Sequence, residues 1–216
     1  MCRFWTAGVA RTLMVLGLVV GFAGNADAVM TESSALQIPQ GQFVQNLGDQ
    51  AIHILADKAL KPDQRQEHFR RLLETTFDMP TIGHFVLGRL WNSTGEAQRI
   101  EYMDLFERLL LKSYSARFAL YTGEGFKVIS VRPEGDRDVV VVSNITHPDG
   151  SAPTTVEWRV RQNGTSFGII DVVVEGVSMS VTQRQEYASV IQRNGGEIEG
   201  LLRVMRQNLA ADSSKG

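Results

Sequence analysis

The chain has 216 residues, of which 43% are hydrophobic and 21% are charged, and its formal net charge is −2. This length and apolar content suit one sizeable domain, and the near balance of charge lacks the basic excess typical of nucleic-acid-binding proteins. The single cysteine, Cys2, excludes a disulfide within the chain and a zinc site built from cysteines.

Residues 1–28 are predicted to be a secretory signal peptide. Arg3 and Arg11 form a positive n-region, the apolar run 13–23 is short for a membrane span, and 26–28 is a small-x-small cleavage site. The alternative is a retained N-terminal anchor, which the shortness of the apolar run disfavours. We therefore expect the mature protein to reside in the periplasm.

The rest of the chain divides into a lead-in, one domain and a tail. Residues 29–40 are small and polar and are expected to form a flexible lead-in, whereas 211–216 are expected to be a frayed tail. The segment between them, 41–210, contains no internal repeat, low-complexity stretch or linker, so it is predicted to fold as a single domain.

The first half of this domain is predicted to be helical, because apolar residues recur there at helical spacing. The predicted helices are 41–60, 62–77, 80–90 and 93–121. The third helix contains more bulky hydrophobic residues than one buried face requires. This surplus is the first indication of an unusually apolar interior.

The pattern then changes to short β-branched segments separated by turn residues, which predicts strands. The predicted strands are 127–132, 138–146, 154–162 and 166–175. Val156, Trp158 and Val160 alternate with charged residues, which indicates a strand with one buried and one solvated face. Turn sequences at 148–150 and 163–164 are hairpin signals, so the sheet is predicted to be antiparallel.

Two helices are predicted to follow the sheet. Thr182 and Gln185 form a capping box that opens the first, Asn194-Gly195-Gly196 breaks it, and apolar residues line one side of a last helix over 198–209. Helices, then an antiparallel sheet, then helices again predict a single α+β domain.

The search for catalytic residues is largely negative. The four histidines lack the spacing of a helical metal site, and the segment 176–180 begins like a nucleophile elbow but lacks the closing glycine. Asp171 lies in an otherwise apolar strand and could act as a general base in a cone-shaped α+β enzyme. The alternatives are an outward-facing position or an ion pair with Arg89, Arg159 or Arg161.

The apolar surplus is the positive signal. The simplest interpretation is that it fills the core between the helices and the sheet, and the alternative is that part of it lines a ligand pocket. The candidate pocket residues are Val86, Leu87, Leu90, Phe106, Leu110, Tyr114 and Phe118 on the helices, and Trp158, Val173, Val177 and Met179 on or after the strands. Arg89 is the candidate for a phosphate at the pocket mouth, or for a structural pair with Asp171.

Several of these segments resemble the MlaC/Ttg2D family of periplasmic phospholipid-binding proteins. The resemblance lies in Phe77-Asp78-Met79, Val86-Leu87-Gly88-Arg89-x-Trp91, the segment 171–178 and Asn194-Gly195-Gly196. It runs in order over roughly residues 40–209. The chain is also similar to the hopanoid-associated HpnM branch, which would hold a rigid polycyclic lipid instead of a diacyl one.

The resemblance implies a helical layer on a curved antiparallel sheet, an NTF2-like cone with a deep apolar pocket. That pocket would take the acyl chains of a phospholipid and leave the headgroup at its mouth. The implied partners are an outer-membrane lipoprotein–porin complex and an inner-membrane ABC transporter with an MCE-domain subunit. It further implies a monomer with no cofactor, no metal, no enzymatic activity and no nucleic-acid partner.

Overall fold

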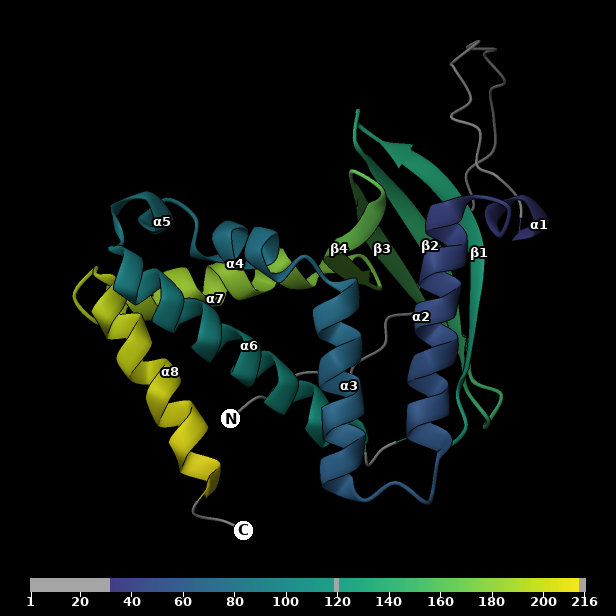
Figure 1. Cartoon of the computed structure of the whole chain (residues 1–216), viewed down its shortest axis with the longest axis horizontal. Coiled ribbons are helices and arrows are strands. Elements are labelled where there is room, and N and C mark those ends of the chain that lie inside the picture. The colour runs from purple at the N-terminus through teal and green to yellow at the C-terminus, as the bar shows by residue number, and fades with distance from the viewer. Residues whose placement is uncertain (1–31, 119–120, 214–216) are drawn as a thin grey trace, which may run out of the picture.

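A computed structural model describes residues 32–118 and 121–213, and the predicted signal peptide lies outside these ranges (Figure 1). The described helices are α1 (Glu32–Ala35), α2 (Pro39–Ala56), α3 (Pro62–Thr76), α4 (Met79–Leu87), α5 (Leu90–Ser93), α6 (Glu96–Phe118), α7 (Met179–Arg193) and α8 (Ile198–Ser213). The strands are β1 (Gly125–Glu134), β2 (Asp138–Thr146), β3 (Thr154–Asn163), β4 (Ser166–Val174) and β5 (Val177–Ser178). Within the described ranges, no helix is both long and apolar enough to cross a bilayer.

The strands form one curved open sheet of five strands, in the order β1-β2-β3-β4-β5 (Figure 1). Every neighbouring pair is antiparallel, which confirms the predicted α+β class and the antiparallel sheet. A tight turn joins β4 to β5, with Glu175 and Gly176 both at positive φ, 49° and 79°. Two successive positive φ values are the backbone of a type I′ hairpin turn, which favours glycine at its second position.

The N-terminal boundary differs from the expected flexible lead-in over 29–40. The structure places the short helix α1 within that segment and starts α2 at Pro39. Ala35 is fully buried, because α1 packs against β1 beside the start of α2. At the other end, α8 continues to Ser213, into the expected tail.

The start of α7 also differs from the predicted capping box at Thr182. The helix begins at Met179, because Ser178 is its N-cap and accepts a hydrogen bond from the N–H of Val181 at 3.1 Å. The hydroxyl of Ser178 is fixed in turn by Asp171 of β4, to which it donates at 2.6 Å. A contact from another strand therefore decides where this helix begins.

One face of the sheet is covered by α1, α2 and α3, and together they form what we call the sheet–helix core. Its buried residues are Ala35, Val44, Leu47, Leu72, Val128, Val131, Val141, Val160 and Ile169. Gly48 lets α2 approach β1 closely, because a Cβ at this position would lie 2.0 Å from the ring of Phe126.

A second core lies among α4, α6, α7 and α8, and we call it the helical core. Its buried residues are Met79, Ile82, Val86, Leu87, Tyr102, Leu105, Phe106, Ile191, Ile198, Leu201, Leu202 and Met205. Tyr102 stacks on Phe106 with ring centroids 5.8 Å apart, and its hydroxyl donates to the carbonyl of Gly83 at 3.1 Å. Burial raises the pKa of Tyr102, so this hydroxyl remains a neutral donor.

The junction between α3 and α4 joins the two cores. Phe77 packs against both of them and forms a parallel bridge with Ile169 of β4. The N–H of Asp78 donates to the carbonyl of Ile169 at 2.9 Å. The carboxylate of Asp78 accepts from the N–H of Thr81 at 3.0 Å and from the amide of Asn163 at 3.1 Å. One acidic residue thus caps α4 and ties it to the β3–β4 hairpin.

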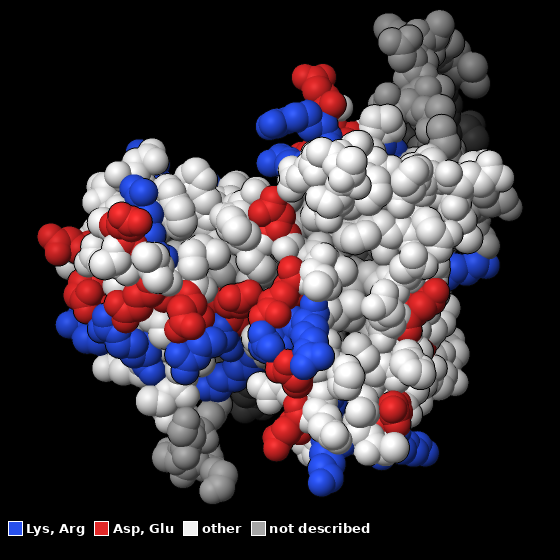
Figure 2. Space-filling model, in the orientation of Figure 1, with Lys and Arg blue, Asp and Glu red and all other residues white. Residues whose placement is uncertain are grey.

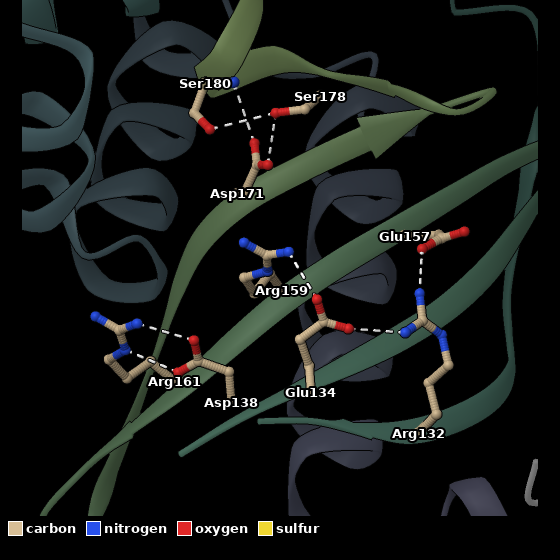
Figure 3. Close-up of polar contacts among 9 residues, drawn as sticks. All are labelled: Arg132, Glu134, Asp138, Glu157, Arg159, Arg161, Asp171, Ser178 and Ser180. Atoms are coloured by element: carbon tan, nitrogen blue, oxygen red, sulfur yellow. Dashed lines mark hydrogen bonds and ion pairs between the residues drawn. The ribbon is translucent and has the colours of Figure 1, made fainter. Parts of the chain in front are cut away.

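The face of the sheet opposite α2 carries paired charges (Figure 3). The pairs are Arg161–Asp138, Arg159–Glu134, Arg132–Glu134 and Arg132–Glu157, with N–O distances of 2.8 or 2.9 Å. The hydrogen bonds from Arg161 lower the pKa of Asp138. These pairs leave the outer face polar, so the apolar side of the sheet is the one that faces α2 and α3.

Candidate functional site

The predicted pocket residues on the helices lie together, but in the helical core. Val86, Leu87 and Phe106 are each 5% exposed or less. Leu90 and Leu110 are partly buried and pack against the same cluster. Tyr114 and Phe118 belong to α6, and their side chains lie outside the described residues. The described members of this group fill a core.

The predicted pocket residues on the sheet side do not join that group. Trp158 borders the sheet–helix core, where it pairs with Val172 on β4. Val173 is one residue further along the strand and therefore points to the outer face, opposite Glu157. Val177 lies on β5 and is 47% exposed, and Met179 is the first residue of α7. The structure therefore does not gather the predicted helix and sheet residues around one space.

A different set of apolar residues remains half-buried along the sheet–helix core, and we call it the apolar margin. Its members come from α2, α3, β1, β3 and β4. They are Ala51, Ile54, Phe69, Phe126, Trp158 and Val172. They are apolar side chains that the three helices cover only in part. Such a partly covered apolar surface is typical of a ligand-binding or interaction site.

Trp158 shows how the margin stays apolar. Its indole N–H donates to the hydroxyl of Ser143 at 2.9 Å, and that hydroxyl donates to the carbonyl of Val156 at 3.3 Å. Its ring meets Phe126 edge to face, with centroids 6.0 Å apart. The polar atom is thus satisfied within the sheet, while the ring presents apolar surface.

Phe69, Phe126 and Val172 were not among the candidate site residues predicted from the sequence. Phe126 lies one residue before the predicted strand 127–132, and Phe69 lies within the predicted helix 62–77. Tertiary contacts bring them together, since Trp158 opposes Val172 in the strand register, its ring contacts Phe126, and Phe69 packs on the same core from α3. Helical or strand periodicity within one segment does not contain that information.

Two hollows open on the surface of the described residues. The first lies between α2 and α3, has a volume of about 320 Å³, and is lined by Gln50, His53, Ile54, His68, Arg71, Leu72 and Thr75. The second, of about 500 Å³, lies at the β1–β2 turn and is lined mostly by polar residues such as Asp136 and Arg137. Neither of these two hollows is the deep apolar pocket that the family resemblance implies.

The charged side chains on the face shown in Figure 2 gather over α3, α6 and α8, whereas the surface over α2 is largely uncharged. On α3, Glu67 accepts hydrogen bonds from Arg70 and Arg71, which lower the pKa of Glu67 to about 2. The first hollow therefore lies beside a charged helix surface on one side and an uncharged one on the other.

Asp171 is buried, as the sequence suggested, and its hydrogen bonds join β4 to the start of α7 (Figure 3). The residue is 8% exposed, and its carboxylate accepts from the hydroxyl of Ser178 at 2.6 Å, the N–H of Ser180 at 3.1 Å and the N–H of Val172 at 2.9 Å. A carboxylate at a helix N-terminus is favoured by the helix dipole. These contacts give Asp171 a structural role, in which it joins β4 to the start of α7.

The ion pairs considered for Asp171 are not the ones that form. Arg159 pairs with Glu134 and Arg161 with Asp138. Arg89 is an exposed residue at the N-terminal end of α5. The carboxylate of Asp171 accepts from three donors, one each in β4, β5 and α7. Arg89 therefore stays a candidate for a surface role only.

No group of three or more histidine, cysteine, aspartate or glutamate side chains within the described residues is arranged to hold a metal ion. The fold and the site together define a small α+β protein with an incompletely covered apolar face.

Comparison with known proteins places this chain in a family. The family model described as "MlaC protein" matches residues 45–207, and the chain therefore belongs to the MlaC family. Toluene tolerance protein ttg2D of Pseudomonas putida is 21% identical over 204 residues, covering 92% of this chain and 94% of that protein. These matches confirm the family resemblance seen in the sequence.

A solved structure shares the fold. It is the phospholipid-binding protein from Ralstonia solanacearum in complex with a phospholipid, which superposes with a TM-score of 0.68. The match covers 79% of this chain and 96% of that one, at 22% sequence identity. The likeness confirms the arrangement of helices on a curved antiparallel sheet.

Proposed function

We propose that this protein is a periplasmic lipid carrier that shelters phospholipid acyl chains at the apolar margin. The observation that carries the proposal is the margin itself, since Phe126, Trp158 and Val172 present a continuous half-covered apolar face with its polar atoms satisfied. Membership of the MlaC family and the fold shared with a phospholipid complex support it.

Binding by burial needs no catalytic group. Removing each methylene of an acyl chain from water contributes about 0.8 kcal/mol, so two chains supply a large driving force without a cofactor. The first hollow, of about 320 Å³, lies at the low end of ligand-pocket volumes. Acyl chains would therefore be admitted by separation of α2 and α3 over the margin.

Release of a lipid held by burial requires a partner that favours the open state. We propose that an inner-membrane ABC transporter with an MCE-domain subunit and an outer-membrane lipoprotein–porin complex are those partners. The carrier would act as a monomer that moves lipid between the two membranes, and its signal peptide would direct it to the periplasm.

Native mass spectrometry of the protein purified from its host periplasm tests this function. The expected result is a non-covalent adduct with the mass of a phospholipid, released on denaturation. A polycyclic lipid in its place would assign the chain to the hopanoid branch. Protein that carries no lipid, and takes none up from phospholipid vesicles, would refute the proposal.

Two adjacent residues of β4 provide a matched pair for locating the site. Val172 faces the sheet–helix core and Val173 faces the outer surface, and both are half-buried. Val172→Glu should abolish lipid co-purification, because it places a charge at the margin, whereas Val173→Glu should retain it. Far-UV circular dichroism confirms that each variant is folded. The reverse pattern would support the pocket predicted from the sequence, which contains Val173.

A further inference from the structure

The hollow between α2 and α3 combines an apolar floor with a rim of hydrogen-bond donors. Its lining residues follow helical spacing, so each helix presents one side to it: Gln50, His53 and Ile54 from α2, and His68, Arg71, Leu72 and Thr75 from α3. Ile54 and Leu72 are the apolar residues, and the other five are polar. The hollow is thus built for an amphiphilic group.

The hydrogen-bond donors around the hollow between α2 and α3 are suited to binding an anion. Arg71 is the one formally charged residue among those that line the hollow. It bonds Glu67 through Nε at 2.8 Å, and the described contacts leave its Nη1 and Nη2 for another acceptor. His53 and His68 are exposed, and each imidazole carries at least one N–H donor in any tautomer. A phosphate, with several acceptor oxygens, can use donors that converge from two helices.

The floor leads toward the sheet–helix core. Leu72 is 5% exposed and belongs to that core, and Ile54 belongs to the apolar margin. Phe69, one turn before Leu72 on α3, is also part of the margin. A group held in the hollow would therefore have apolar surface directly beneath it, where hydrocarbon tails can pass between the two helices.

We infer that this hollow is the binding site for the phosphate of an anionic phospholipid whose acyl chains reach the apolar margin. The inference rests on the proposed carrier function and adds the position of the headgroup. It moves the phosphate from Arg89, the residue predicted from the sequence, to Arg71, His53 and His68. The volume of about 320 Å³ fits a headgroup and not a whole diacyl lipid.

The expected contribution of Arg71 is modest. Its side chain is 67% exposed, and it shares Glu67 with Arg70, so solvent and a neighbouring carboxylate both weaken its field. We expect Arg71→Gln to reduce affinity for an anionic phospholipid by about 3- to 10-fold, the range of a partly screened charge-assisted hydrogen bond. His53→Gln together with His68→Gln should add a smaller loss.

The test compares two lipids with identical acyl chains, phosphatidylglycerol and diacylglycerol, binding to delipidated protein. Arg71→Gln should weaken phosphatidylglycerol binding and leave diacylglycerol binding unchanged. Arg70→Gln is the matched control, because it removes the same charge from the same exposed helix at a residue that does not line the hollow. That variant should bind both lipids like the wild type.

Each other outcome overturns the inference in a distinguishable way. If both lipids bind normally to Arg71→Gln, the hollow does not hold the headgroup, although the carrier function stands. If Arg71→Gln and Arg70→Gln weaken phosphatidylglycerol binding equally, the loss is due to the reduced positive charge of the surface and not to a specific site. If inorganic phosphate binds through Arg71 but does not compete with phosphatidylglycerol, the hollow is a free-phosphate site. If the wild type binds neither lipid, the carrier function fails as well.

Discussion

The helical core and the sheet–helix core contain similar kinds of side chains but end differently at their surfaces. The helical core closes on itself, with Tyr102, Phe106 and Leu202 almost fully buried among four helices. The sheet–helix core ends in the apolar margin, where Phe126 and Trp158 stay half-buried. The first core is therefore closed, whereas the second leaves apolar surface that is only partly covered, and this is where we propose that the lipid binds.

Two of the segments that resemble the MlaC family, 77–79 and 171–178, lie where these two cores meet. Asp78 ties α4 to β4 and to the β3–β4 hairpin, and Asp171 ties the start of α7 to β4. The Glu175-Gly176 turn and the cap residue Ser178 complete the second junction. These two segments therefore specify how the cores are joined, and the second also contains Val172 of the apolar margin.

The largest effect is expected from truncating the helical core. Phe106 is 2% exposed and contacts Tyr102 and Tyr187, so Phe106→Ala should lower the free energy of unfolding by about 3–5 kcal/mol. Urea unfolding at 25 °C measures this loss. The lipid bound per folded molecule should stay unchanged, because we propose that the lipid binds at the sheet–helix core. Loss of lipid with the fold intact would instead support the pocket predicted from the sequence.

Asp171→Ala should cause the next largest loss in the free energy of unfolding. It would leave the hydroxyl of Ser178 and the N–H of Ser180 without their acceptor, at a cost of about 2–3 kcal/mol. Hydrogen exchange should accelerate first in α7, because the lost contacts fix its start. Asp171→Asn should cost less, since its amide oxygen can still accept. Unchanged hydrogen exchange in α7 of the Asp171→Ala variant would contradict the role of Asp171 in fixing the start of this helix. It would favour the alternative in which Asp171 is a general base.

The longer helices and strands were predictable from the sequence because each depends on local periodicity, whereas the short elements α1, α5 and β5 were not predicted. The strand 138–146 matches β2 residue for residue, and alternation at Val156, Trp158 and Val160 identified the buried face of β3. Val172 and Val173 were not separable in this way. Both lie in a continuous apolar run, and an irregularity between the pairs of Arg159 and Val160 shifts the register of β4 by one residue.

The division of the apolar residues into two cores could not be predicted from the sequence either. A helical pattern shows which side of α4 or α6 is apolar but not which element that side will meet. Phe106 and Trp158 were therefore assigned to one pocket, although they belong to different cores. The buried state of Asp171 was predictable from its apolar neighbours. Its partners were not, because Ser178 and Ser180 reach it through a turn whose geometry is tertiary.

Asp78→Ala tests the other junction and should cost about 1–2 kcal/mol, the range for loss of an N-cap with its neighbouring hydrogen bonds. Partial burial acts to raise the pKa of Asp78, but the hydrogen bonds from Thr81 and Asn163 hold it below its ordinary value of 3.8. The stabilisation is therefore complete above that value and is lost as the pH falls through the lower folded pKa. Thermal unfolding at pH 7 should separate wild type from variant.

The control for this prediction is to measure the melting temperatures of the wild type and Asp78→Ala at acid pH. As the carboxyl of Asp78 becomes protonated in the folded state, the difference between the two melting temperatures should shrink. A difference independent of pH would mean that the carboxylate itself contributes little and that the substitution acts by another route.

The smallest effect on stability is expected for a substitution where α6 meets α3, and this substitution should stabilise the protein. Burial and the nearby carboxylate of Glu74 raise the pKa of Glu107, so its ionised form is disfavoured in the folded state. A carboxyl whose folded pKa is raised costs stability as the pH rises through its ordinary value, and the cost is complete above the folded pKa. Glu107→Gln should therefore raise the melting temperature by about 1–3 °C at pH 7 and change nothing near pH 4, where both states are largely protonated. Asp104→Asn removes a weaker contribution to the same pKa shift and also the ion pair of Asp104 with Arg108, so its gain should be clearly smaller than that of Glu107→Gln. An equal gain from both substitutions would indicate a general effect of charge on α6 instead of burial of Glu107 beside Glu74.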